Sequence, residues 1–149
     1  MMSRGEIVPF ETTLRIRDNC LCLHVQRAAR ALARRFDDVL RPFGITNGQF
    51  SLLMALNRPQ PPPMGPVASL LAMDRTTLTA ALKPLQRRGL VEVSQDPSDR
   101  RSRILALTEK GQKLLASAVP VWESTHREIE QLIPNESPDD LRKSLQALS

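Results

Sequence analysis

The chain has 149 residues, of which 41% are hydrophobic and 25% are charged, and its formal net charge is +5. This balance is typical of one folded domain and excludes a disordered, collagen-like or disulfide-stapled chain. The longest uncharged stretch, residues 42–57, is too polar to span a bilayer, and the N-terminus lacks an apolar secretory segment. We therefore expect a cytoplasmic protein with no membrane partner.

Positive charge is concentrated in the middle of the chain. Residues 74–113 carry nine cations and five acids, whereas residues 114–149 carry three cations and six acids. A basic segment followed by an acidic one indicates one surface for a polyanion and another for a different contact. A basic, solvated surface without a partner is the alternative interpretation.

A long N-terminal helix is predicted from apolar residues that recur at spacings of three, four and seven between Leu14 and Val39. Pro42 and Gly44 end this helix. An apolar stripe of this length packs on other helices, either of the same chain or of a second copy. Another face of the same helix carries four arginines: Arg27, Arg30, Arg34 and Arg41.

Two short helices are expected next. Thr46 is a suitable N-cap, and the helix after it would bury Phe50, Leu53 and Met54. A stiff, proline-rich connector at residues 59–63 leads to a helix at residues 66–72, which would bury Val67, Leu70 and Leu71. Both helices would therefore contribute to the core that supports the more polar helix after them.

A third helix begins after Asp74, runs to Arg88 and stops at Gly89. Its inward residues are apolar: Leu78, Ala81, Leu82 and Leu85. Its outward face carries short or basic side chains: Thr76, Thr79, Ala80, Lys83 and Arg87. Pro84 removes one backbone donor, but it lies past the first two turns, so the N-terminal part of the helix should stay regular.

The apolar periodicity then changes from helical to alternating. Residues 90–94 and 104–107 predict the two strands of a hairpin. The polar tip between them contains Asp99 and three arginines within four residues: Arg100, Arg101 and Arg103. We expect Asp99 to pair with a nearby arginine and to hold its guanidinium extended. Thr108 and Ser137 then cap two further helices.

Three helices followed by a hairpin predict a winged helix-turn-helix, a mainly α fold with a small β-hairpin wing (α+β). Such a fold presents its third helix to the major groove of double-stranded DNA. Short side chains allow close approach to base edges, a role that fits Thr76, Thr79 and Ala80.

The remaining polar residues of this region suit the DNA backbone and the minor groove. Lys83 and Arg87 are long enough for phosphates or guanine edges, and Arg75 and Thr77 lie at the helix start, where the dipole favours phosphate. Arginines at the hairpin tip suit a narrow minor groove. A polar helix face or a basic tip alone is also typical of solvated surface. Their adjacency in this order favours DNA binding.

Four segments resemble the MarR family of bacterial repressors. They read Asp-Arg-Thr-Thr-Leu-Thr at 74–79, Leu-Gln-Arg-Arg-Gly-Leu-Val at 85–91, Asp-Pro-Ser-Asp-Arg-Arg at 96–101 and Leu-Thr-Glu-Lys-Gly at 107–111. The resemblance implies that the helix at residues 75–88 is the recognition helix, that Arg101 enters the minor groove and that Asp99 orients it.

The same resemblance implies the organisation of the whole chain. Residues 1–149 would form a single domain, with dimerisation helices at residues 12–41 and 109–149 and a winged helix-turn-helix region at residues 45–108. The implied function is a homodimeric repressor on a pseudo-palindromic operator, without catalytic activity. No cofactor is expected.

Two kinds of signal could release such a repressor from DNA. The resemblance implies a small phenolic or aromatic-acid ligand. Residues 18–22 also resemble the organic-hydroperoxide-sensing branch of the family, whose reactive cysteine falls on Cys22. However, Gln26 and Phe36 stand where that branch has supporting tyrosines, and no second cysteine lies near the C-terminus.

The cysteines also have less specific interpretations. Cys20 and Cys22 would point about 200° apart on one helix, which disfavours a disulfide between them, and either could simply pack as a small apolar residue. Cys20 and His24 share a helix face, but two or three ligands make a weak metal site, and none is expected. A thiol enzyme would need a base and an oxyanion site beside Cys22. A winged-helix protein-interaction module without DNA binding is the remaining alternative.

Overall fold

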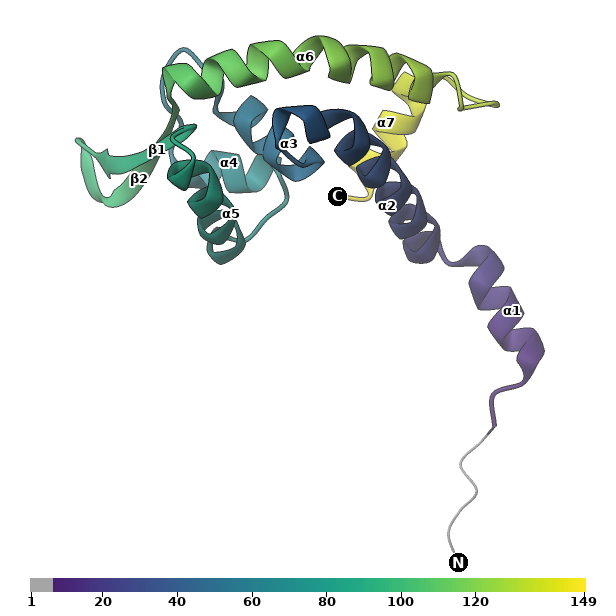
Figure 1. Cartoon of the computed structure of the whole chain (residues 1–149). Coiled ribbons are helices and arrows are strands. Elements are labelled where there is room, and N and C mark those ends of the chain that lie inside the picture. Colours follow the sequence, from purple (N-terminus) through teal and green to yellow (C-terminus); the bar gives the residue numbers. More distant parts are fainter. Residues whose placement is uncertain (1–6) are drawn as a thin grey trace, which may run out of the picture. The chain divides into compact units, whose positions relative to one another are not determined.

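The computed structural model describes residues 7–149, and its chain divides into two compact units (Figure 1). The first unit ends at Arg35 and the second covers Phe36–Ser149, so the boundary falls inside helix α2 (Leu21–Leu40). No helix among the described residues is long and apolar enough to cross a membrane. The chain is mainly helical with one two-stranded hairpin, as the sequence predicts.

The predicted continuous N-terminal helix is wrong at one position. The structure has α1 (Phe10–Asn19) and then α2, separated by Cys20 in an extended conformation. Side chains bond to backbone carbonyls on both sides of the break: the Asn19 amide donates to the Arg15 carbonyl at 2.8 Å, and His24 Nδ1 lies 2.8 Å from the Cys20 carbonyl oxygen. Cys20 and Cys22 therefore do not share one helix.

Three helices form the centre of the second unit: α3 (Asn47–Leu56), α4 (Met64–Leu70) and α5 (Arg75–Arg87). The 3₁₀ turn η1 (Arg41–Phe43) precedes them. Thr46 caps α3 through a capping box with Gln49, which confirms the predicted N-cap. The core between these helices and the hairpin is rich in leucine, and its most buried members include Leu53, Leu78, Leu85 and Leu105.

The burial expected for two of the apolar residues is wrong. Met54 is 47% exposed and Leu70 is 54% exposed, whereas Leu52 and Ala55 are buried. Helix α3 contacts α4, α6 (Glu109–Glu130) and the second strand, so it buries more than one face and its inward set is wider than a single stripe. Leu70 is the last residue of the short α4, so fewer neighbouring residues cover its side chain.

The hairpin is longer than predicted. Strand β1 (Val91–Asp96) pairs antiparallel with β2 (Asp99–Leu107), with Val91 opposite Leu107 and an irregularity after Gln95. The Leu105 N–H also donates to the Pro62 carbonyl at 2.9 Å, which ties the proline-rich connector to β2. The hairpin therefore extends as a wing from a base that is fixed to the core.

Two helices complete the second unit. Helix α6 begins after Thr108, whose hydroxyl accepts the Gly111 N–H at 3.0 Å, and continues through Pro120. Helix α7 (Pro138–Ala147) begins after Ser137, whose hydroxyl accepts the Asp140 N–H. Both N-caps were predicted from sequence. In Figure 1, α6 runs past α3 from the base of the hairpin to the turn before α7.

Candidate nucleic-acid interface

Helix α5 separates a buried face from an exposed polar face. Leu78, Leu82 and Leu85 are buried in the core, which fixes the rotation of the helix. Every residue proposed to face DNA is exposed: Arg75, Thr76, Thr77, Thr79, Ala80, Lys83 and Arg87. The rotation therefore matches the one predicted from the apolar periodicity.

Five of these residues line one shallow hollow of about 320 Å³ on the outer face of α5: Arg75, Thr76, Thr79, Ala80 and Lys83. The Thr79 hydroxyl donates to the Arg75 carbonyl at 2.8 Å, so its methyl group and lone pairs are left for an outside partner. Ala80 contributes only a methyl group to the lining of the hollow. The surface combines two cations with short side chains, the composition that a base-reading helix needs.

The first turn of α5 is held by the Asp74 carboxylate, which accepts the Thr77 N–H at 2.7 Å. This hydrogen bond lowers the pKa of Asp74 below its usual value. A lowered pKa in the folded state means that the stabilisation is present above the unfolded-state pKa near 3.8, and that it is lost as pH falls through the lower, folded value.

We therefore expect the stabilising effect of Asp74 to shrink in acid. In urea unfolding between pH 3 and pH 7, the free-energy difference between the wild type and Asp74→Asn should be largest near neutral pH and should decrease below about pH 4. Asparagine keeps an oxygen acceptor at the cap, so the comparison isolates the charge. A difference that is constant with pH would contradict this role.

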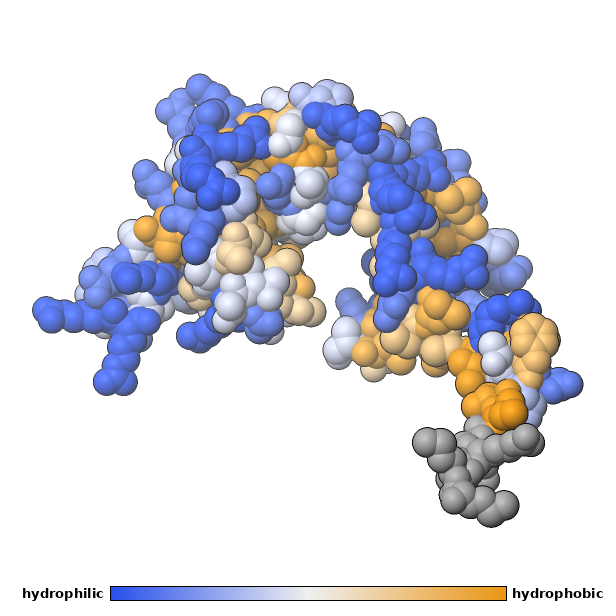
Figure 2. All heavy atoms as spheres, turned by 60° about the horizontal axis from the view of Figure 1, so that its bottom comes forward, coloured by the Kyte–Doolittle hydropathy of each residue, from blue (hydrophilic) through white to orange (hydrophobic). Residues whose placement is uncertain are grey.

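The wing carries three exposed arginine side chains at and beside its tip: Arg100, Arg101 and Arg103. The Asp96 carboxylate accepts the Ser98 N–H and hydroxyl, which lowers the pKa of Asp96 and fixes the turn. Figure 2 shows strongly hydrophilic side chains projecting from the end of the hairpin. The turn of the wing is therefore fixed by hydrogen bonds, while the guanidinium groups of its arginines extend into solvent.

Asp99 was expected to pair with the guanidinium of a nearby arginine, but it contacts the backbone of Arg101 instead. Its carboxylate accepts the backbone N–H of Arg101 at 3.0 Å, and no ion pair between Asp99 and a guanidinium is present in residues 7–149. The carboxylate thus holds the backbone at the start of β2 rather than an arginine side chain. The guanidinium of Arg101 keeps its donors for an outside acceptor.

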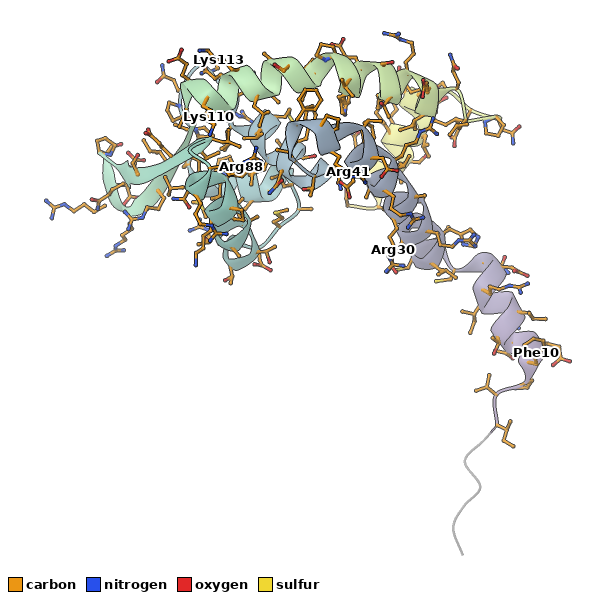
Figure 3. The ribbon with its side chains drawn as sticks, in the orientation of Figure 1. Phe10, Arg30, Arg41, Arg88, Lys110 and Lys113 are labelled. Atoms are coloured by element: carbon orange, nitrogen blue, oxygen red, sulfur yellow. The ribbon has the colours of Figure 1, made fainter. Side chains whose placement is uncertain are left out.

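Sequence reasoning missed the side chains that fix the C-terminal end of α5. Arg88 Nη1 donates to the Gly44 carbonyl at 2.6 Å, and Lys110 Nζ donates to the Arg88 carbonyl at 2.8 Å (Figure 3). The Thr108 hydroxyl donates to the Gly89 carbonyl at 2.6 Å. These bonds join α5 to the turn before α3 and to the start of α6. Their partners are far away in sequence, so no local pattern could reveal them.

The two cysteines lie in different surroundings. Cys20 is partly buried at the break between α1 and α2, and Cys22 is exposed in the first turn of α2. The Gln26 amide donates to Cys22 Sγ at 3.1 Å, and Arg30 donates to the Gln26 oxygen at 3.4 Å. No group of three or more metal-ligating side chains occurs in the described part of the chain.

The helices, the exposed face of α5 and the basic hairpin together define a winged-helix protein. Residues 45–102 match the MarR family. The structure is similar to that of the transcriptional regulator MosR of M. tuberculosis in complex with DNA, with a TM-score of 0.78 and 35% identity over 87% of this chain and 93% of that one. The chain belongs to the MarR family of transcriptional regulators, a family of regulators rather than enzymes.

Two relatives that match in sequence are also transcriptional regulators. The repressor NicR of Pseudomonas putida is 37% identical over 76 residues, which are 51% of this chain and 48% of NicR, so the match spans about half of that relative's length. The organic hydroperoxide resistance regulator of Bacillus subtilis is 28% identical over 104 residues, 70% of this chain and 71% of that protein.

Proposed function

We propose that this protein is a dimeric, sequence-specific DNA-binding repressor that acts in the cytoplasm. The observation that carries the proposal is the exposed hollow on α5, where five residues with the chemistry of a base-reading surface lie together on a helix fixed by its core face. The free arginines of the wing support a second contact in the minor groove. The similar regulator MosR has been solved in complex with DNA, which supports DNA as the partner.

The proposed contact residues fall into two groups. On α5, they are Arg75, Thr76, Thr77, Thr79, Ala80, Lys83 and Arg87. On the wing, Arg100, Arg101 and Arg103 contact DNA, with Asp99 holding the backbone of Arg101. The whole winged region is residues 45–108.

Dimerisation is assigned to the helices at residues 12–41 and 109–149, within one MarR-type domain of residues 1–149. Large apolar side chains are exposed at both ends of the chain, including Phe10 at 71% and Leu148 at 64%. Figure 2 shows hydrophobic surface at the N-terminal end of the described chain. Exposed apolar area of this kind is costly in a monomer, and a second copy would cover it.

The proposal is tested with fluorescently labelled DNA taken from the region flanking the protein's own gene. Anisotropy titration should show binding that weakens as salt rises, because phosphate contacts release counterions. Binding to a scrambled duplex should be much weaker. Affinity that does not depend on salt would instead favour a winged-helix module that binds another protein.

Lys83→Ala tests how α5 contacts DNA. If the ammonium group binds a phosphate, the variant should lose affinity by a similar factor on the operator and on scrambled DNA, and its salt slope should fall by about 1 per bound protomer. If it binds a base edge, discrimination between the two duplexes should shrink instead. Unchanged affinity on both duplexes would remove Lys83 from the interface.

A small phenolic or aromatic-acid ligand is proposed as the signal that releases the DNA. The Trp122 ring stacks on His126 at 4.6 Å between centroids, and both line a surface hollow of about 350 Å³ together with Glu123, Arg127 and Glu130. The aromatic faces suit the ring of such a ligand, and the two carboxylates suit a phenolic hydroxyl, which can donate to them, better than a further carboxylate. Tryptophan fluorescence titration with phenols and with aromatic acids, followed by the same titration in the presence of operator DNA, tests this assignment.

The alternative signal is an oxidant acting on Cys22. Its thiol is exposed, lies in the first turn of α2 and contacts Gln26. The similarity to the Bacillus subtilis organic hydroperoxide resistance regulator favours this reading. A hydroperoxide would oxidise the thiolate to sulfenic acid and leave as the alcohol.

Cys22→Ser separates the two signals. If the thiol is the sensor, organic hydroperoxide should release wild-type protein from operator DNA and should leave the Ser variant bound, because an alcohol side chain is not oxidised in this way. Cys20→Ser is the matched control and should still respond. A Cys22→Ser variant that still releases DNA after peroxide would dismiss the thiol sensor.

A further inference from the structure

The proposed function does not account for a set of arginines on α2. Arg27, Arg30 and Arg34 lie three and four residues apart, so at 100° per residue their side chains fall within about 60° of one another. All three are exposed. We call them the arginine stripe; Arg30 is labelled in Figure 3.

The apolar residues of α2 lie on the opposite side. Leu21, Val25 and Leu32 are exposed to 68%, 40% and 39%, and the helical rotation places them about 180° from the arginine stripe. If a second copy covers the apolar face, as the proposed dimer requires, the stripe faces away from that contact. In such a dimer the stripe is therefore either exposed to solvent or in contact with a partner other than the second copy.

The charges of the stripe are not neutralised by carboxylates. No acidic residue occurs between Asp18 and Asp37. Among the described residues, Arg27 and Arg34 have no hydrogen-bond or ion-pair partner, and Arg30 donates only to the Gln26 amide oxygen at 3.4 Å. By contrast, Arg17 pairs with Asp18 at 2.8 Å and Arg142 pairs with Asp139 at 2.7 Å.

The repulsion between like charges at these spacings destabilises a helix, so a stripe without counter-charges is typical of a surface that meets a polyanion. The chemistry and length of the stripe favour phosphates. Its three side chains span eight residues, a rise of about 10 Å along the helix, which is close to three phosphate-to-phosphate steps along one DNA strand. Guanidinium groups bind phosphate in a bidentate fork, and every cation before Lys83 in this chain is arginine.

We propose that the arginine stripe is a second DNA-contacting surface, which binds the phosphate backbone of double-stranded DNA independently of base sequence. The inference rests on the proposed DNA-binding function and adds a contact outside the winged region. Its contribution should be equal on every sequence, because phosphates carry no base identity.

The test compares two triple variants of the full chain in anisotropy titrations over a range of salt, on the operator and on a scrambled duplex. Arg27→Gln/Arg30→Gln/Arg34→Gln removes the stripe. The matched control, Arg17→Gln/Lys113→Gln/Arg142→Gln, removes the same charge from cations that are already paired with carboxylates. Glutamine has a helix propensity similar to that of arginine, so α2 should persist, and circular dichroism checks this.

The stripe variant should show a salt slope that is smaller by about 2–3 per bound protomer on both duplexes, and the control should keep a nearly wild-type slope. The ratio of the two affinities should stay unchanged. Replacing the three arginines by lysines should restore most of the slope, because a lysine still contacts a phosphate as a point charge. If the glutamine triple fails to fold, Arg30→Gln alone should lower the slope by about 1 per bound protomer.

Equal slopes for the stripe and control variants would overturn the inference. Equal slopes together with weaker self-association of the stripe variant, measured by sedimentation, would identify a second copy of this chain as the partner instead. In each of these cases the wild type still binds the operator more tightly than the scrambled duplex. A wild type that binds both duplexes equally would instead refute the proposed function, and with it the stripe.

Discussion

Arg101→Ala should weaken operator binding by about 1–3 kcal/mol, roughly 5- to 150-fold. The guanidinium lies at the wing, is exposed and has no acceptor among the described residues, so its donors are free for the minor groove. A narrow minor groove has an enhanced negative potential, which a neutral methyl group cannot use. The backbone at Arg101 is held by Asp99, so truncation of the side chain should leave the wing in place.

The measurement is an anisotropy titration on the operator, with thermal unfolding as a check on the fold. Arg142→Ala is the control, since it removes one cation from α7, outside the proposed DNA contacts. Asp99→Asn should bind nearly as well as the wild type, because an amide oxygen can still accept the Arg101 N–H. Unchanged affinity of Arg101→Ala would reject the wing as a DNA contact.

Gly111→Ala should destabilise the protein by about 1–3 kcal/mol, even though glycine to alanine within a helix is ordinarily favourable. An added Cβ at Gly111 would overlap the carbonyl oxygen of Leu90. That oxygen belongs to backbone just before β1 and accepts the Thr108 N–H at 3.1 Å, so it cannot move without disturbing the junction between the hairpin and α6.

Urea unfolding measures this effect, and Gly48→Ala is the matched control. Gly48 also lies in the first turn of a helix, α3, but its added Cβ would meet only the Thr46 hydroxyl, at 3.9 Å. The control should be neutral or slightly more stable than the wild type. If both variants have the same free energy of unfolding, close packing at Gly111 is not what requires glycine there.

Local sequence chemistry was sufficient for the starts of four helices. Thr46, Asp74, Thr108 and Ser137 all cap helices as predicted, because a side-chain oxygen satisfies N–H groups only two or three residues away. The rotation of α5 was predictable for a similar reason. Its apolar residues recur at helical spacing, so the polar face had to lie opposite them.

Burial was less predictable where an element meets several neighbours. The sequence assigned one inward face to α3, but the helix lies between α4, α6 and β2, so Leu52 and Ala55 are buried and Met54 is exposed. The break at Cys20 was also missed. Apolar residues recur at helical spacing on both sides of Cys20, so periodicity does not report a single residue with an extended backbone.

The sequence by itself determined the class of fold and the face of α5 that is exposed, because both depend on short-range periodicity, N-caps and the order of the elements. The tertiary structure alone decided how that face is held. Arg88, at the C-terminal end of α5, donates to the Gly44 carbonyl. Lys110 donates to the Arg88 carbonyl, and Thr108 donates to the Gly89 carbonyl, so the start of α6 also holds this end of α5. The tertiary structure also decided that Asp99 binds the backbone of Arg101 and leaves the guanidinium free, since a carboxylate takes whichever donor the turn brings within reach.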